Sequence, residues 1–240
     1  MPNNKYKLAV LIPAYNEEAS IANVIADINA LTYQSFDIDA IVINDCSTDN
    51  TISIIKSANC IVLDLPVNLG IGGAIQTGYR YAKENNYDYA IQVDGDGQHP
   101  ANQIPLLLDN IIDGSHDLII GSRFIQKKGF QSSGMRRLGI GFLRNWIKLF
   151  SGLNIYDNTS GFRLINRELI ELLSNDYPDE YPEPESLIMI SKKGFLIKEV
   201  PVEMQERQGG ESSIKAFDQL YYMVKVSLAI LYTFIKTEKN

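Results

Sequence analysis

The sequence predicts an α/β fold with a mostly parallel central sheet flanked by helices. Short apolar runs alternate with segments whose apolar residues recur every three or four positions, as in strands and amphipathic helices. Polar, acid-bearing motifs follow three of the apolar runs. In a parallel α/β sheet, ligands bind beyond the carboxyl ends of the strands. The pattern therefore predicts the architecture and the edge of the sheet that carries the site.

The first half of the chain supplies most of this alternation. Apolar runs predict strands at Leu8–Ile12, Ala40–Asn44, Cys60–Leu65, Tyr89–Val93 and Leu118–Gly121. The helical spacing between them covers Ile21–Leu31, Thr51–Ala58, Gly73–Asn86 and Ile104–Ile112. Strands that alternate with helices are typical of βαβ units, whose helices cover both faces of the sheet.

The second half is less regular. We expect an amphipathic helix at Leu138–Phe150, a strand at Phe195–Val202 and a final helix at Ser213–Ile235. The segment Tyr177–Pro184 contains too many prolines to be helical throughout. A polar, glycine-bearing loop occupies Glu203–Ser213.

No linker is long enough to separate two domains. We therefore expect one catalytic domain over residues 1–214. Residues 215–240 then form an amphipathic helix that packs on this domain, on an oligomer partner or on a membrane surface.

Composition excludes several classes of protein. Hydrophobic residues make up 45% and charged residues 21%, as in ordinary folded domains. The net charge is −7 and the pI about 4.9, so the chain repels nucleic acid, and Lys127-Lys128 and Arg136-Arg137 are interpreted as a solvated loop. Two cysteines without a Cys-x-x-Cys pattern argue against structural zinc and favour a reduced, cytoplasmic protein.

The motif Asp94-Gly-Asp-Gly-Gln98 is the strongest sign of chemistry. Side chains two residues apart on an extended segment point the same way, so Asp94 and Asp96 can share one cation, with Gln98 adding a carbonyl. Mg²⁺ and Mn²⁺ prefer such oxygen ligands and complete their shell with ligand phosphates. The alternatives are a plain β-turn and an EF-hand loop, which lacks its glycine and its final glutamate here.

Eight motifs follow one another between residue 8 and about residue 214. They are Ile12-Pro-Ala-Tyr-Asn-Glu17, Val42-Ile-Asn-Asp-Cys-Ser47, Asn68-Leu-Gly-Ile-Gly-Gly-Ala74, Asp94-Gly-Asp-Gly-Gln-His-Pro100, Gly121-Ser-Arg-Phe124, Thr159-Ser-Gly-Phe-Arg163, Glu199-Val-Pro201 and Glu206-Arg-Gln-Gly-Gly-Glu-Ser-Ser213. With these motifs the chain resembles family 2 glycosyltransferases of the GT-A fold. It is most similar to the branch of dolichol-phosphate mannose synthases and bacterial polyprenyl-phosphate sugar transferases.

The resemblance implies a donor pocket for a nucleoside diphosphate sugar. Pro13, Tyr15 and Glu17 would line it, with Tyr15 near the base, and Asp45 would bind base or ribose. From the local sequence alone, a turn or helix-cap acid is a plausible alternative for Asp45. Gly70 would let the backbone approach the donor at the start of a helix. Asp94 would serve both donor and metal.

The resemblance also implies catalytic residues. Arg123 and Arg207 would bind phosphate, and Arg207 would close over the donor. Asp157 is the candidate base or acceptor-site carboxylate, with Glu183 and Glu185 as alternatives. An anionic lipid phosphate would need no base. His99 and His116 receive no role.

The resemblance thus implies a metal-dependent, inverting glycosyltransferase that uses Mg²⁺ or Mn²⁺. The acceptor would be a polyprenyl phosphate or a cell-surface glycan. An inactive sugar-nucleotide-binding scaffold and a nucleotidyltransferase are the alternatives. A nucleotidyltransferase would ordinarily carry a basic, glycine-rich loop near its start, whereas Pro13–Glu18 is acidic.

The apolar segments Leu138–Phe150 and Leu220–Ile235 leave the membrane question open. Neither reaches the roughly 18–20 consecutive apolar residues of a spanning helix. Both could lie on a membrane surface, pack on the sheet or form a homo-oligomer, with packing or oligomerisation favoured. A membrane partner protein is a further alternative. The expected location is the cytoplasm, with the cytoplasmic face of a membrane left open.

Overall fold

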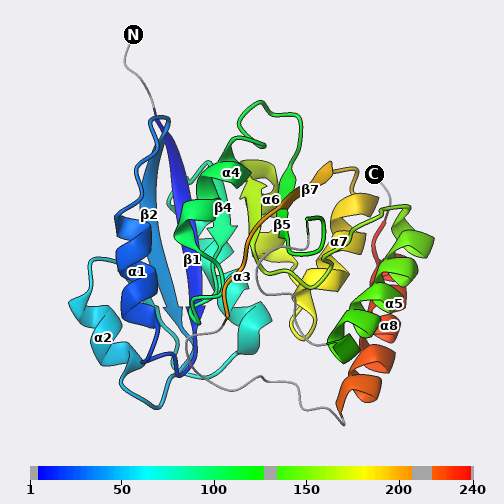
Figure 1. The fold of residues 1–240 in the computed structure, drawn as a ribbon, viewed down its shortest axis with the longest axis horizontal. Helices are drawn as coiled ribbons and strands as arrows, with labels where there is room; N and C mark the ends of the chain where they lie inside the picture. The colour runs from blue at the N-terminus through cyan, green and yellow to red at the C-terminus, as the bar shows by residue number, and fades with distance from the viewer. Residues whose placement is uncertain (1–4, 127–133, 207–217, 239–240) are drawn as a thin grey trace.

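The computed structural model describes residues 5–126, 134–206 and 218–238 (Figure 1). A seven-stranded sheet runs through its centre in the order β3-β2-β1-β4-β6-β5-β7. The strands are β1 (Tyr6–Ala14), β2 (Phe36–Asn44), β3 (Ile61–Asp64), β4 (Tyr89–Gln92), β5 (Leu118–Ser122), β6 (Arg163–Asn166) and β7 (Ile197–Pro201). Only β6 runs antiparallel to its neighbours, β4 and β5. The prediction of a mostly parallel sheet is confirmed.

Helices cover both faces of this sheet. They are α1 (Ile21–Asn29), α2 (Thr51–Ser57), α3 (Gly70–Glu84), α4 (Ile104–Leu108), α5 (Gly134–Ser151), α6 (Arg167–Asn175), α7 (Pro182–Lys192) and α8 (Asp218–Lys236), with a 3₁₀ turn η1 at Ala101–Gln103. The alternation along β1 explains the two layers. Leu8, Val10 and Ile12 enter one core with α1 and α4, whereas Ala9 and Leu11 enter the other with α3, α6 and α7.

Several predicted elements differ in extent from those observed. The helix expected at Ile104–Ile112 ends at Leu108 and is followed by turns. The short strand β6 and the helix α6 were not predicted. Helix α7 begins at Pro182, a position where proline suits the first helical turn. The segment Tyr177–Pro184 is therefore helical only from Pro182 onward, and the prediction that it is not helical throughout is confirmed.

Helices α5 and α8 pack side by side at one end of the molecule (Figure 1). The indole N–H of Trp146 donates to the carbonyl of Ser227 at 3.1 Å, and the rings of Phe150 and Phe234 lie 5.0 Å apart. Leu143 and Ile147 of α5, together with buried apolar residues of α8, belong to the hydrophobic core. Within the described ranges no helix has the length and apolar character needed to cross a bilayer. The proposed boundary at residue 214 lies outside the described residues.

The first turn of α3 packs closely on the segment before α7, because Gly72 has no side chain. A Cβ at Gly72 would lie 2.3 Å from the carbonyl oxygen of Asp179 and 2.4 Å from that of Pro178. Backbone atoms cannot yield as a flexible side chain can. This contact therefore fixes the distance between helix α3 and the acidic start of α7.

We predict that Gly72→Ala lowers the free energy of unfolding by about 1–3 kcal/mol through overpacking. Gly141→Ala is the matched control, because an added Cβ on this exposed α5 position meets nothing within 4 Å. The control should instead gain about 0.5–1 kcal/mol from helix propensity. Denaturant unfolding measures both. A Gly72→Ala protein as stable as the wild type would contradict the close approach.

Candidate functional site

Three neighbouring parallel strands, β2, β1 and β4, end at the same edge of the sheet. The loops after β1 and β2 are joined by hydrogen bonds. The N–H of Asn16 donates to Ser47 Oγ at 3.0 Å, and the N–H of Thr48 donates to Asn16 Oδ1 at 2.8 Å. Asn16 and Cys46 adopt left-handed backbone angles, with φ of 56° and 59°. The tight turns expose the ring of Tyr15 at this edge.

Asp45 is buried and supports the start of α3. Its Oδ1 accepts the N–H of Leu69 at 2.7 Å, and its carbonyl accepts the side-chain amide of Asn68 at 3.2 Å. Gly70 follows with φ of +73°, a conformation that glycine adopts without strain. Asp45 therefore has a cap-like structural role whether or not its second oxygen contacts a ligand.

The acidic motif follows β4 and is oriented by its neighbours. The side-chain amide of Gln92 donates to Asp94 Oδ1 at 3.1 Å, and the N–H of Asp94 donates to His99 Nδ1 at 3.0 Å. The His99 ring stacks on Phe162 with centroids 5.0 Å apart. Asp96 Oδ1 accepts the N–H of Gln98 at 2.9 Å. One third of the Asp94 side chain is exposed, so it is accessible to a ligand.

The residues of the motif fit a hard divalent cation that is shared with a ligand. Among the described residues no three His, Cys, Asp or Glu side chains gather as a complete metal cage. Two carboxylates and one amide carbonyl leave room in an octahedral shell for phosphate oxygens and water, as Mg²⁺ sites commonly do. Asp94, Asp96 and Gln98 would hold such an ion.

The loop after β1 contacts this motif directly. Ser20 Oγ donates to the carbonyl of Gly95 at 2.7 Å. A Cβ on Gly95 would lie 3.0 Å from the carbonyl of Pro13 and 3.5 Å from Glu17 Cγ. The structure thus brings Pro13 and Glu17 to the acidic motif, as expected from the parallel strand order.

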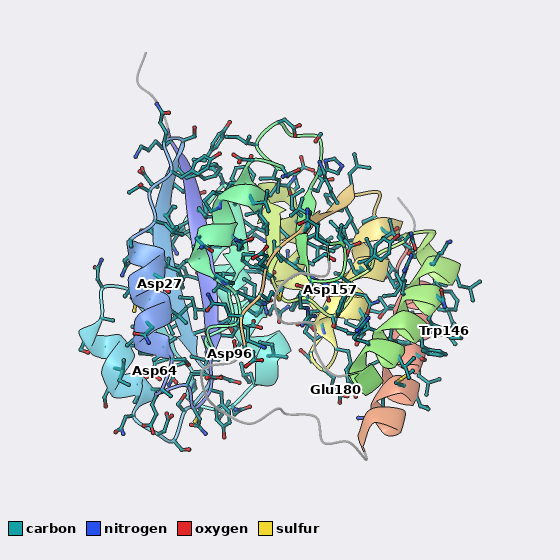
Figure 2. The ribbon with its side chains drawn as sticks, in the orientation of Figure 1. Asp27, Asp64, Asp96, Trp146, Asp157 and Glu180 are labelled. Atoms are coloured by element: carbon teal, nitrogen blue, oxygen red, sulfur yellow. The ribbon has the colours of Figure 1, made fainter. Side chains whose placement is uncertain are left out.

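Arg123 and Asp157 form a buried ion pair beside this edge. Arg123 Nε donates to Asp157 Oδ2 and its Nη2 to Oδ1, both at 2.7 Å, and its backbone N–H donates to Oδ2 at 3.0 Å. Arg123 is 8% exposed and Asp157 is fully buried. Figure 2 shows Asp157 and Asp96 in the central part of the molecule. Both oxygens of Asp157 are therefore engaged in holding the arginine.

The electrostatics connect this pair to the acidic motif. Burial alone would lower the pKa of Arg123, but the hydrogen bonds and charge of Asp157 outweigh it and raise the pKa. The charges of Asp94 and Glu183 act in the same direction. Arg123 therefore lies within electrostatic reach of the predicted metal ligand and of a candidate base, and it keeps its charge.

The two alternative carboxylates on α7 have different surroundings. Glu183 influences Arg123, as just described. Glu185 instead accepts a hydrogen bond from Thr233 Oγ1 of α8 at 3.2 Å, and burial raises its pKa. Of these two, only Glu183 is among the charges that raise the pKa of Arg123.

The turn before β6 brings the Thr159–Arg163 motif to the Asp94–Gln98 motif. A Cβ on Gly161 would lie 2.5 Å from Gln92 Nε2 and 3.3 Å from Asp94 Oδ1. Arg207 lies outside the described residues. The chain two residues earlier lies beside the motif, because the N–H of Gln205 donates to the carbonyl of Gln98 at 3.1 Å.

Sequence reasoning missed Gln92 and Gly161 as neighbours of Asp94. For Gln92 a signal existed. It precedes Asp94 by two residues at the end of a strand, so both side chains point the same way. The contact of Gly161 depends on the antiparallel pairing of β6 and has no local signal.

Comparison with known proteins agrees with this geometry. The model of glycosyl transferase family 2 matches residues 9–173. The chain belongs to this family. It is 30% identical to the UDP-N-acetylglucosamine–dolichyl-phosphate N-acetylglucosaminyltransferase of Methanococcus voltae, over 80% of this chain and 83% of that protein. It is 25% identical to the polyprenol monophosphomannose synthase of Mycolicibacterium smegmatis, over 91% and 84% of the two chains.

Solved structures support the fold of this glycosyltransferase. Glucosyl-3-phosphoglycerate synthase from Mycobacterium tuberculosis, in complex with Mn²⁺, UDP-glucose and phosphoglyceric acid, superposes with a TM-score of 0.68. The sequence identity is 23%, and the match covers 95% of this chain and 80% of that one. The predicted GT-A fold is confirmed.

We predict that Asp157→Asn and Arg123→Met each lower the free energy of unfolding by about 3–5 kcal/mol, because each leaves a buried, uncompensated partner. The double variant should lose less than the sum. Asp37→Asn, which breaks an exposed pair with Lys5, is the control and should change stability by less than about 1 kcal/mol. Additive losses in urea unfolding would show that the pair is not coupled.

Proposed function

We propose that this glycosyltransferase moves a sugar from a nucleoside diphosphate sugar to a polyprenyl phosphate with inversion, dependent on Mg²⁺ or Mn²⁺. The observation that supports it best is the direct contact between the loop after β1, at Pro13 and Glu17, and the Asp94–Gln98 motif after β4 at one sheet edge. Several relatives are named for dolichyl, polyprenol or undecaprenyl phosphate acceptors.

On the donor side, the proposal gives each residue a role. Tyr15 packs on the base, Pro13 and Glu17 line the pocket, and Asp45 contacts base or ribose with its remaining oxygen capacity. Gly70 allows close approach of the backbone at the start of α3. A metal ion held by Asp94 and Asp96 would neutralise the charge of the leaving diphosphate.

On the acceptor side, a lipid phosphate is already an anionic nucleophile and needs no general base. This suits Asp157, whose oxygens are engaged by Arg123. Asp157 then acts by holding Arg123 toward a phosphate, and Arg207 closes over the donor. A glycan acceptor would instead require a base, for which Glu183 is the better-placed candidate on α7.

The outer surfaces of α5 and α8 support a second part of the proposal: attachment to the surface of an anionic membrane. Large apolar side chains at three- to seven-residue spacing are exposed on both helices, namely Leu138, Phe142 and Leu149 on α5 and Val224, Leu228, Tyr232 and Ile235 on α8. Such stripes are typical of surfaces that meet a membrane or another protein.

Charge favours the membrane as the occupant. Helix α5 carries four basic residues and no acidic residue, in a chain with net charge −7. In a symmetric dimer this basic face would meet its own copy and be repelled, whereas an anionic bilayer attracts nearby basic side chains. The polyprenyl acceptor resides in such a bilayer. Two free cysteines fit the proposed cytoplasmic face.

For the metal, we predict that Asp96→Asn reduces sugar transfer to undecaprenyl phosphate at least about 100-fold, because the leaving diphosphate loses its neutralising ion. EDTA should do the same to the wild type. Asp27→Asn on the exposed face of α1 (Figure 2) is the control and should keep full activity. Radiolabelled UDP- and GDP-sugars provide the assay. Full activity of Asp96→Asn would refute the metal role, and nucleotide binding without transfer would favour the inactive scaffold.

For the membrane, we predict that Leu228→Glu weakens binding to mixed phosphatidylcholine–phosphatidylglycerol vesicles about tenfold or more. An exposed apolar side chain that is proposed to insert into the bilayer is replaced by one with the same negative charge as the lipid headgroups. Leu196→Glu is a matched control, since Leu196 is 58% exposed and Leu228 is 61% exposed. Vesicle flotation measures both. Equal binding of the two variants would overturn the surface assignment, and a change in oligomeric state for Leu228→Glu would assign it to a second copy.

A further inference from the structure

Glu199 on β7 holds two consecutive backbone N–H groups of the acceptor-side turn. Its Oε2 accepts the N–H of Tyr156 at 2.7 Å, and its Oε1 accepts that of Asp157 at 2.8 Å. Each carboxylate oxygen thus accepts one backbone N–H. The Glu199-Val-Pro201 motif has no role in the chemistry described above, so this contact calls for an explanation.

Glu199 binds the backbone N–H of Asp157, and the side chain of Asp157 binds Arg123. Asp157 is fully buried and accepts three hydrogen bonds from Arg123. Strand β7 runs parallel to β5, with Glu199 in register with Ile120, three residues before Arg123. Hydrogen bonds therefore link Glu199 on β7 to Asp157 in the turn before β6, and Asp157 to Arg123 just after β5.

We propose that Glu199 is a positioning residue that sets the guanidinium of Arg123 by fixing the backbone beneath Asp157. The inference rests on the proposed function insofar as Arg123 is taken to face a substrate phosphate. Glu199 itself touches neither donor nor acceptor. We expect its effect on turnover to pass through Asp157.

The chemistry of this position favours a carboxylate. Two N–H groups that point at one side chain need two acceptors, and a glutamine offers one acceptor and one donor. Burial raises the pKa of Glu199, although the two N–H groups oppose that shift. Placing a carboxylate there thus costs free energy that an apolar side chain would not, and the two hydrogen bonds offset it.

The experiment is a mutant cycle with Glu199→Gln, Asp157→Asn and the double variant. Glu168→Gln, an exposed acid at the start of α6, is the control with the same chemical change. We expect Glu199→Gln to lower kcat/KM for the lipid acceptor about 10- to 100-fold, as small misplacements of a binding group do. The KM for the donor should stay unchanged. Glu199→Asp, which keeps a shorter carboxylate, should fall between Glu199→Gln and the wild type.

The double variant decides between positioning and independent structural damage. If Glu199 acts through Asp157, the double variant loses as much kcat/KM as Asp157→Asn alone, because Asp157→Asn has already broken the link between Glu199 and Arg123. Losses that multiply would overturn the proposal, as would an unchanged Glu199→Gln enzyme. Melting curves establish that each variant is folded.

A second measurement does not depend on activity. Hydrogen exchange of the Arg123 Nε–H, followed by NMR, should be faster in Glu199→Gln than in the wild type and unchanged in Glu168→Gln. Equal exchange in all three proteins would overturn the proposal by itself. If the wild type transferred no sugar, the proposed function would be refuted. The exchange rates would still test whether Glu199 positions Arg123.

Discussion

The parallel pairing of β1 with β2 and β4 is the constraint on which the site depends. β1 pairs with β2 from Tyr6 to Ala14 and with β4 from Leu8 to Leu11, and its residues from Leu8 to Ala14 are buried. A slip of one residue would move the apolar side chains of β1 to the wrong face of the sheet. It would also displace Tyr15 and Glu17 relative to Asp45 and Asp94. The register that fills the two cores therefore also sets the spacing of the residues that are proposed to bind the donor.

The acceptor side is joined to this edge by the antiparallel strand β6. Because β6 lies between β4 and β5, the turn before it crosses the carboxyl ends of both strands. Gly161 then approaches Asp94, and Asp157 reaches Arg123. A buried charge pair is weak evidence for stability, but it fixes the direction of both side chains. This fits a site where an arginine must keep its charge and its orientation at once.

The sequence was sufficient for features with local patterns. The βα alternation, the acid-bearing loops after β1, β2 and β4, and the Asp94–Gln98 motif each lie within a few residues, so periodicity and spacing identify them. It was insufficient where contacts join distant segments. β6 has four residues and follows a polar turn, and short apolar runs do not distinguish a strand from a buried helical turn. The partnership of Arg123 with Asp157 spans 34 residues and that of Glu199 with Asp157 spans 42. Side-chain contacts of this kind follow only from the three-dimensional pairing of strands.

The most direct test of the account is a crystal structure with Mn²⁺ and UDP or GDP, with diffraction data collected at the manganese absorption edge. The account predicts one anomalous peak between the carboxylates of Asp94 and Asp96, with the diphosphate on the metal and the base against Tyr15. A metal bound elsewhere, or a nucleotide away from the carboxyl ends of β1, β2 and β4, would contradict it.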